Sequence, residues 1–337
     1  MFSDFKIPDV PKENLFHAIR LLCCMIVIYE HAVGLSGVTL FNLSLASVAV
    51  KVFFILSGFW VTISLLRSDC IKEYIFKRCK KILPPYWTVV IAEALLLCVF
   101  SRLSARNYFT DAGFWKYIAA NLSTLNFLHP SLPGIFEGLP LNGAVNGALW
   151  TIKIELAFYV CLPPVVWLLN RLSKNARGGV FVLMYFLSFL YSAGCHFLAS
   201  AKPSFAPLQN QFPAFVTYFT CGMAVALFWK PLIMVLNYAV FPAFVLLLLC
   251  LWLDNFILSA LLLPLVLTLV VFWCALRIQF GGRFVTKDFS FGMYLVHYPL
   301  VMLFVQQGFF DSCWELAFAG VMGLSFLCAY FLRRLSW

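Results

Sequence analysis

The chain has 337 residues, of which 63% are hydrophobic and 11% charged, and its mean hydropathy is +0.92. A soluble domain would be about half apolar and about a quarter charged, so this composition excludes an ordinary water-soluble fold. The net charge of +10 does not indicate a nucleic-acid partner, because Lys and Arg lie in short segments between apolar spans, where they orient a membrane protein. The expected surroundings are therefore a lipid bilayer.

Apolar stretches of about 20 residues, the length that crosses a bilayer as a helix, recur from one end of the chain to the other. They predict an all-α fold, a polytopic transmembrane helix bundle that forms one domain over residues 1–337, with no separate soluble domain. The expected spans are 15–35, 44–66, 84–102, 147–169, 179–199, 211–229, 232–252, 255–275, 289–308 and 314–332.

Two connections between these spans have a recognisable character. Residues 67–83 are expected to form a basic loop that ends at Pro84-Pro85. Residues 103–146 begin with an amphipathic stretch, 114–127, and continue into a segment rich in Pro and Gly.

The distribution of basic residues predicts the orientation of the chain. With ten spans and the N-terminus in the cytoplasm, eighteen Lys and Arg residues lie inside and four outside. Basic residues concentrate on the cytoplasmic side of membrane proteins, so both termini are expected there. The inner set includes Arg67, Lys174, Arg283 and Lys287.

A charge at the bilayer centre costs at least ~2.5 kcal/mol, so each ionisable group in a span needs an explanation. Arg20 and His31 are eleven residues apart, which places them on one helix face, about 16 Å apart along the axis. A guanidinium can bind a nucleotide phosphate, and a neutral imidazole can take a proton from an alcohol. For Glu93 and several others, helix packing is a competing interpretation.

Three further groups of residues are candidates. The basic residues between Lys77 and Lys81 form either a membrane-surface anchor or a phosphate clamp. Glu155 lies one helical turn before Tyr159, and Tyr294 lies three residues before His297, next to Pro299. The twelve cysteines lie mostly inside apolar spans and have no paired spacing, so no metal site is expected.

Five segments together resemble the acyltransferase-3 family of integral membrane acyltransferases. Arg20 and His31 fit the first-helix pattern of that family, and residues 53–59, which include Ser57 and Gly58, fit the second. Arg78 and Lys81 fit its basic motif, with Lys81 in place of the second Arg. The other two similar segments are the outer loop with the fourth helix, 132–136 and 145–155, which include Trp150 and Glu155, and the ninth-helix segment 290–299, with Tyr294 and His297. Lys51 stands where many members carry Asp.

The resemblance implies a multi-pass protein of the inner (plasma) membrane that transfers an acetyl group from cytoplasmic acetyl-CoA to a hydroxyl. The acceptor would be a surface glycan such as O-antigen, or a lipid-linked saccharide, and no permanently bound cofactor is expected. Arg20, Arg78 and Lys81 would bind the donor. His31 would be the general base, with His297 as its rival and Glu155 as an acidic partner. Ser57 would be a candidate acyl carrier, and Gly58 would allow close helix approach.

Two other functions remain open from the sequence. A glycolipid or polysaccharide transporter or flippase would also carry buried charges, but such proteins often consist of two related halves with broken helices, and the sequence contains no internal repeat. A structural subunit of a polysaccharide assembly complex would tolerate substitution of Arg20 and His31.

Overall fold

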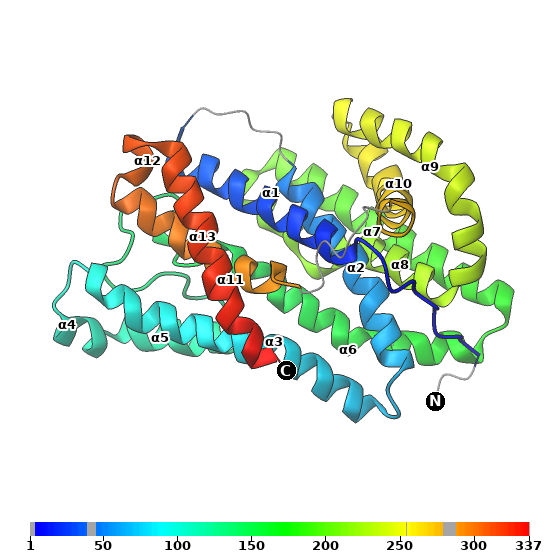
Figure 1. Cartoon of the computed structure of the whole chain (residues 1–337), viewed down its shortest axis with the longest axis horizontal. Coiled ribbons are helices and arrows are strands. Elements are labelled where there is room, and N and C mark those ends of the chain that lie inside the picture. Colours follow the sequence, from blue (N-terminus) through cyan, green and yellow to red (C-terminus); the bar gives the residue numbers. More distant parts are fainter. Residues whose placement is uncertain (1–3, 39–44, 254, 279–287, 337) are drawn as a thin grey trace. The chain divides into compact units, whose positions relative to one another are not determined.

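The computed structural model describes residues 4–38, 45–253, 255–278 and 288–336 (Figure 1). Within these ranges the chain is helical and contains no strand. In lipid, a helix satisfies its backbone hydrogen bonds within one segment, which explains why so apolar a chain adopts this structure. The α-helices are α1 Phe16–Ser36, α2 Ala46–Leu66, α3 Ile71–Leu96, α4 Ala105–Thr110, α5 Ala112–Leu122, α6 Trp150–Arg171, α7 Lys174–Ala201, α8 Phe212–Leu227, α9 Trp229–Trp252, α10 Phe256–Arg277, α11 Ser290–Gln306, α12 Phe309–Ser312 and α13 Trp314–Leu332. Short 3-10 helices are η1 Leu97–Phe100, η2 Leu141–Gly143, η3 Gly147–Leu149, η4 Pro203–Asn210 and η5 Arg333–Ser336.

A helix occupies each of the ten predicted spans. Among the described residues, eight helices are long and apolar enough to cross a membrane. The other two, α8 with 16 residues and α11 with 17, lie where spans were expected but are shorter. The prediction of an all-helical, multi-pass membrane protein is confirmed. The orientation of the termini stays a prediction. Arg283 and Lys287, which were counted among the cytoplasmic basic residues, lie outside the described residues.

The expected loop at 67–83 is wrong, because α3 already begins at Ile71 and runs through Pro84 and Pro85. The carboxylate of Glu73 in its first turn accepts a hydrogen bond from the backbone N–H of Asp69, 2.7 Å away, and so stabilises this earlier start. Each proline removes one helical hydrogen bond, yet a membrane helix tolerates prolines when neighbouring groups compensate. The basic residues Lys77, Arg78 and Lys81 are therefore held on a helix.

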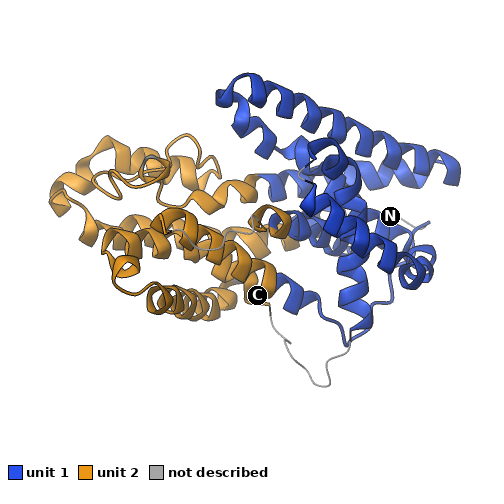
Figure 2. Ribbon diagram, turned by 90° about the horizontal axis from the view of Figure 1, so that it is seen from above, with its two compact units in different colours: residues 1–20, 50–75, 154–286 blue, residues 21–49, 76–153, 287–337 orange. Residues whose placement is uncertain are grey.

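Contacts between Cα atoms divide the chain into two compact units (Figure 2). The first unit comprises residues 1–20, 50–75 and 154–286, and the second comprises 21–49, 76–153 and 287–337. The division falls inside α1, α2, α3 and α6.

In the first unit, glycines let α2 and α8 approach closely. A Cβ atom at Gly58 would collide with the backbone carbonyl oxygen of Phe219, and one at Gly222 would collide with that of Ile55. Small residues at such a crossing bring two backbones into van der Waals contact, which drives helix association in membranes. The close approach expected at Gly58 is therefore present.

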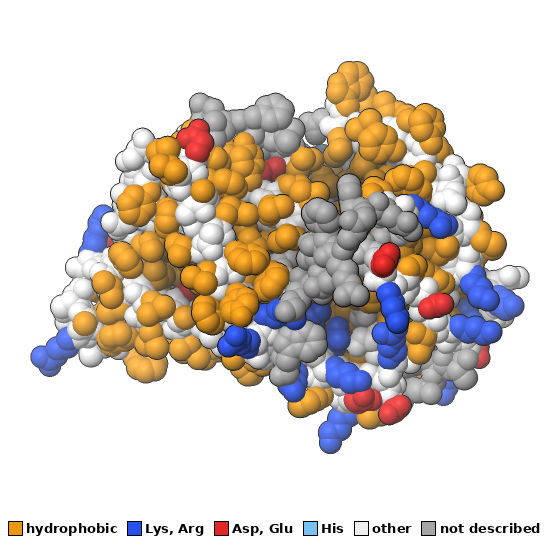
Figure 3. Space-filling view, viewed as in Figure 1, with side chains coloured by type: hydrophobic (Ala, Val, Ile, Leu, Met, Phe, Trp, Pro, Cys, Tyr) orange, Lys and Arg blue, Asp and Glu red, His pale blue; other side chains and the backbone are white. Residues whose placement is uncertain are grey.

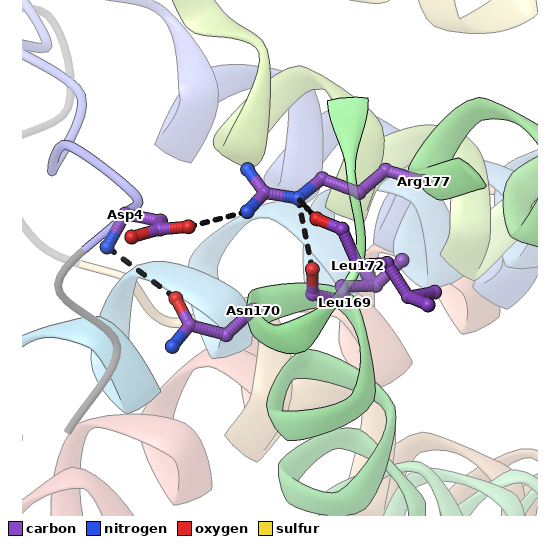
Figure 4. A network of polar contacts seen from close by, with 5 residues as sticks. All are labelled: Asp4, Leu169, Asn170, Leu172 and Arg177. Carbon is purple, nitrogen blue, oxygen red and sulfur yellow. Dashed lines mark hydrogen bonds and ion pairs between the residues drawn. The ribbon is translucent and has the colours of Figure 1, made fainter. Parts of the chain in front are cut away.

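Arg177 ties together three segments of the first unit (Figure 4). Its Nε donates to the carbonyl oxygens of Leu169 and Leu172, at 2.8 and 3.1 Å, near the end of α6. Its guanidinium also lies 2.5 Å from the Asp4 carboxylate, and the backbone N–H of Asp4 donates to the side chain of Asn170. A cation thus satisfies carbonyls that the helix end leaves open and fixes the N-terminal segment there.

In the second unit, the long connection is a packed structure. Asp111 caps α5 by accepting from the backbone N–H of Gly113, and α5 buries Phe114 and Tyr117, as its amphipathic pattern predicts. The following loop is closed by a hydrogen bond from the Val145 N–H to the Pro130 carbonyl, 2.8 Å long. The loop therefore delivers residues 146–151 to a defined place in this unit.

Large hydrophobic side chains are exposed on the surface of many helices. Figure 3 shows hydrophobic side chains over most of the visible surface of α9 and α13. On α9, Tyr238 is 86% exposed and Trp252 is 79% exposed. Contiguous apolar surface of this extent is uncommon on soluble monomers and fits contact with acyl chains.

Candidate functional site

Two histidines from distant parts of the chain meet in the second unit. Nδ1 of His31, on α1, lies 2.8 Å from Nε2 of His297, on α11. Their rings stack at an interplanar angle of 12°. His297 is fully buried and His31 is partly exposed. The residues that the sequence presented as rival bases are therefore hydrogen-bonded partners.

The hydrogen-bond partners assign the tautomers of this neutral pair. Nδ1 of His297 lies 2.8 Å from the carbonyl oxygen of Tyr294, which can only accept, so this nitrogen carries the proton and donates. Nε2 of His297 is then an acceptor, and the proton of the second bond lies on Nδ1 of His31. It follows that Nε2 of His31 keeps its lone pair and is the atom of the pair that can accept a proton.

Two tyrosines of α11, Tyr294 and Tyr298, lie beside the pair and contact the 146–151 segment. The rings of His31 and Tyr298 pack edge to face, with their centroids 5.3 Å apart. Gly147 makes room for Tyr298, because a Cβ atom there would lie 2.9 Å from the tyrosine oxygen. The hydroxyl of Tyr294 donates to the Ala148 carbonyl at 3.0 Å and accepts from Thr151 at 3.1 Å.

A buried polar cluster joins this segment to α3, α5 and α11. The Asn146 amide donates to Glu93 at 2.6 Å and to the Leu295 carbonyl at 2.8 Å. The hydroxyl of Tyr117 donates to the other Glu93 oxygen at 2.9 Å. Glu93, an isolated charge in the sequence, thus joins α3 to α5 and to the 146–151 segment. Sequence reasoning missed Asn146, although an Asn-Gly pair before a helix is a signal for a structural cap.

Two of the other predicted residues form a pair in the first unit. The hydroxyl of Ser57, on α2, donates a hydrogen bond to the carboxylate of Glu155, on α6. Ser57 is buried and Glu155 is half-buried. A serine bonded to a carboxylate is either a packing contact or a nucleophile with an adjacent base.

The remaining predicted residues are distributed over both units. Arg20, half-buried on α1, belongs to the first unit. Arg78, Lys81 and Trp150 belong to the second, where Arg78 and Trp150 are half-buried and Lys81 is exposed. On α3, Arg78 and Lys81 are three residues apart and share a helix face.

Aromatic rings lie beside the two lysines within spans. The Lys51 ammonium lies 5.8 Å from the ring centroid of Tyr218, and that of Lys153 lies 4.4 Å from the ring centroid of Phe127. Cation–π contacts of this kind stabilise an ammonium in apolar surroundings. Glu30 accepts a hydrogen bond from the backbone N–H of Leu45. Among the described residues, no group of three or more His, Cys, Asp or Glu side chains could hold a metal ion.

The chain is similar in sequence to an acyltransferase family and to two known proteins. The sequence model of a membrane acyltransferase family, described as an acyltransferase domain, matches residues 15–334. Nodulation protein 10 of Rhizobium leguminosarum bv. viciae is 27% identical over 229 residues, which cover 64% of this chain and 60% of that protein. The O-acetyl transferase of Shigella phage Sf6 is 28% identical over 181 residues, 52% of each chain. The chain thus spans about half to three fifths of the length of these relatives, and no solved structure matches it.

Proposed function

Because the chain belongs to the acyltransferase-3 family, we propose that it is a membrane O-acetyltransferase that uses acetyl-CoA as its donor. The acceptor is a hydroxyl of a surface glycan or of a lipid-linked saccharide. The observation that carries the proposal is the His31–His297 pair, which leaves one imidazole nitrogen with a lone pair and fixes its orientation. The similarity to an O-acetyl transferase supports the type of reaction.

In the proposed reaction, His31 is the general base. The acceptor hydroxyl gives its proton to Nε2 of His31 while its oxygen attacks the thioester carbonyl of the donor. A carbon–oxygen bond forms, the carbon–sulfur bond breaks, and the CoA thiolate leaves with the proton that His31 took up, which restores the neutral imidazole. A base of this kind typically contributes about 10²- to 10⁴-fold to a rate.

His297 orients the base and stabilises its charged form. Once protonated, His31 still donates through Nδ1 to Nε2 of His297, while His297 donates to the Tyr294 carbonyl. The two hydrogen bonds form a chain that ends on the carbonyl oxygen of Tyr294. When His31 becomes positively charged, each bond in this chain is polarised and strengthened, which stabilises the charge. Enzymes commonly orient a catalytic base through a hydrogen bond to a further residue, and His297 has that place beside His31.

Arg78 and Lys81, both in the second unit with His31, are the proposed ligands of the donor phosphates, and for Arg20, in the first unit, donor binding is proposed from the family resemblance alone. Arg78 and Lys81 share a face of α3, and a guanidinium binds phosphate oxygens through paired, charge-assisted hydrogen bonds. Glu155 and Ser57 offer a second route, in which Ser57 gives its proton to Glu155 and attacks the thioester, so that CoA leaves and an acetyl ester forms on Ser57. The acceptor hydroxyl then takes the acetyl group, and Ser57 regains its proton.

The test uses the purified protein in lipid bilayers with isotope-labelled acetyl-CoA and a mixture of surface saccharides. We expect release of CoA together with label in an ester-linked acetyl group on the saccharide, detected by mass spectrometry. Label on Ser57 in the absence of acceptor would support the second route, whereas Ser57→Ala with normal transfer would exclude it. Movement of an unmodified saccharide across the bilayer without acetyl transfer would instead indicate a flippase.

A further inference from the structure

The carbonyl oxygen of Leu295, at the turn of α11 that carries His297, is held by a residue from outside that helix. Pro299 has no N–H, so the carbonyl four residues earlier, that of Leu295, loses its normal helical donor. The Asn146 amide donates to this oxygen at 2.8 Å. The opening that Pro299 creates is thus filled by a side chain that reaches across from the 146–151 segment.

Both polar atoms of the Asn146 side chain, the amide nitrogen and the carbonyl oxygen, are hydrogen-bonded. One hydrogen of its amide goes to Leu295 and the other to Glu93, at 2.6 Å. Its carbonyl oxygen accepts from the backbone N–H of Ala148, at the start of η3. Because Asn146 is 5% exposed and all of its donors are used, it has one orientation.

The support continues beyond Asn146. Glu93 accepts from Asn146 through one oxygen and from the hydroxyl of Tyr117, on α5, through the other. A buried network in which each member is satisfied is stiff, and removing one member leaves the others unpaired at high cost. Glu93 and Tyr117 thus hold Asn146 in place.

We propose that Asn146 is a positioning residue that acts on the reaction through His297. By holding the Leu295 carbonyl, it fixes the turn from Tyr294 to His297 and with it the bond between His297 and His31. Among the described residues Asn146 makes its side-chain hydrogen bonds to Glu93, Leu295 and Ala148 and none to a histidine. Its effect on the reaction depends on the His31 base, so this inference rests on the proposed function. Glu93 serves the same purpose through Asn146.

The first test replaces Asn146 by Ser, which can still cap η3 but is too short to reach Leu295 and Glu93. We expect kcat for acetyl transfer to fall about 10²-fold, as a misplaced catalytic group does. Binding of acetyl-CoA should be unchanged, because the proposed phosphate ligands lie elsewhere. The matched control is Asn121→Ser, since Asn121 also donates to two carbonyl oxygens, those of Tyr117 and His129, but in α5 and its loop. A kcat in Asn146→Ser that equals that of the control would overturn the proposal.

A double-mutant cycle separates positioning from general stability. If Asn146 acts through His297, Asn146→Ser should cause no further loss of kcat in a His297→Ala background. If the fold losses of kcat in the two single variants instead multiply in the double variant, Asn146 acts independently of the histidine pair. That result would also overturn the proposal.

The third test reads the histidines without any reaction. NMR of the ¹⁵N-histidine-labelled protein in lipid bilayers should show one tautomer for His31, with the proton on Nδ1, and a mixture of tautomers in Asn146→Ser. The same single tautomer in both proteins would contradict the proposal. If the wild-type protein transfers no acetyl group and the tautomer still changes, the positioning role stands and the proposed function fails.

Discussion

Nδ1 of His31 lies 2.8 Å from Nε2 of His297, although 266 positions separate the two residues in the chain. The second hydrogen bond of His297, to the carbonyl of Tyr294, makes the pair directional. Within the pair, only His31 keeps a ring nitrogen with a free lone pair, and the proposed function therefore assigns the two histidines different roles.

The first prediction compares variants at His297. His297→Ala should lower kcat less than His31→Ala does, because the base remains but loses its orientation. His297→Gln should recover part of the loss, since a side-chain carbonyl can accept from Nδ1 of His31. Acetyl transfer in bilayers measures both. A larger loss in His297→Ala than in His31→Ala would show that the base lies on α11.

The second prediction concerns the donor. Reversing Arg78 and Lys81 to Glu should weaken acetyl-CoA binding, because these side chains are the proposed phosphate ligands, while membrane insertion stays intact. Affinity of the wild-type protein should fall as salt rises, since exposed phosphate contacts are screened. The control is Lys116→Glu, at an exposed lysine of α5. If acetyl-CoA binding responds to neither charge reversal nor salt, Arg78 and Lys81 serve only to orient the protein in the membrane.

The third prediction concerns the glycine contact between α2 and α8. Gly58→Ala should destabilise the protein by roughly 1–3 kcal/mol, because the added carbon collides with the Phe219 carbonyl. Gly34→Ala is the matched control, since nothing lies within 4 Å of a Cβ atom there. Thermal unfolding in detergent measures both. Equal midpoints for Gly58→Ala and the wild type would mean that α2 and α8 do not pack as described.

The fourth prediction tests the orientation. Reporter fusions after Arg67 and Lys174 should report the cytoplasm, because basic residues concentrate on that side. A fusion in 130–145 should report the opposite side. Reversal of any one of these signals would remove the ten-span arrangement.

The sequence predicted the helices because apolar length alone specifies a membrane helix. It missed the start of α3, since Pro84 and Pro85 resemble a helix boundary when neighbouring groups are unknown. The candidate residues His31 and His297 were found one at a time. Their pairing was not predictable, because it depends on how α1 packs with α11.

For Asn146 the sequence likewise signals the local contact and not the long-range one. An Asn-Gly pair before a helix is a local signal for a cap, and the backbone N–H of Ala148 confirms that part. The bond to the Leu295 carbonyl depends on a proline more than a hundred residues later, and periodicity within one helix carries no information about it.

The measurement that tests the central claim most directly is acetyl transfer by His31→Ala in lipid bilayers. We expect a rate loss of about 10²- to 10⁴-fold, because the acceptor hydroxyl loses its base, while the variant still inserts and binds acetyl-CoA. The matched control is His129→Ala, at an exposed histidine of the long loop, and should transfer at the wild-type rate. Transfer by His31→Ala at the rate of His129→Ala would contradict the assignment of His31 as the base.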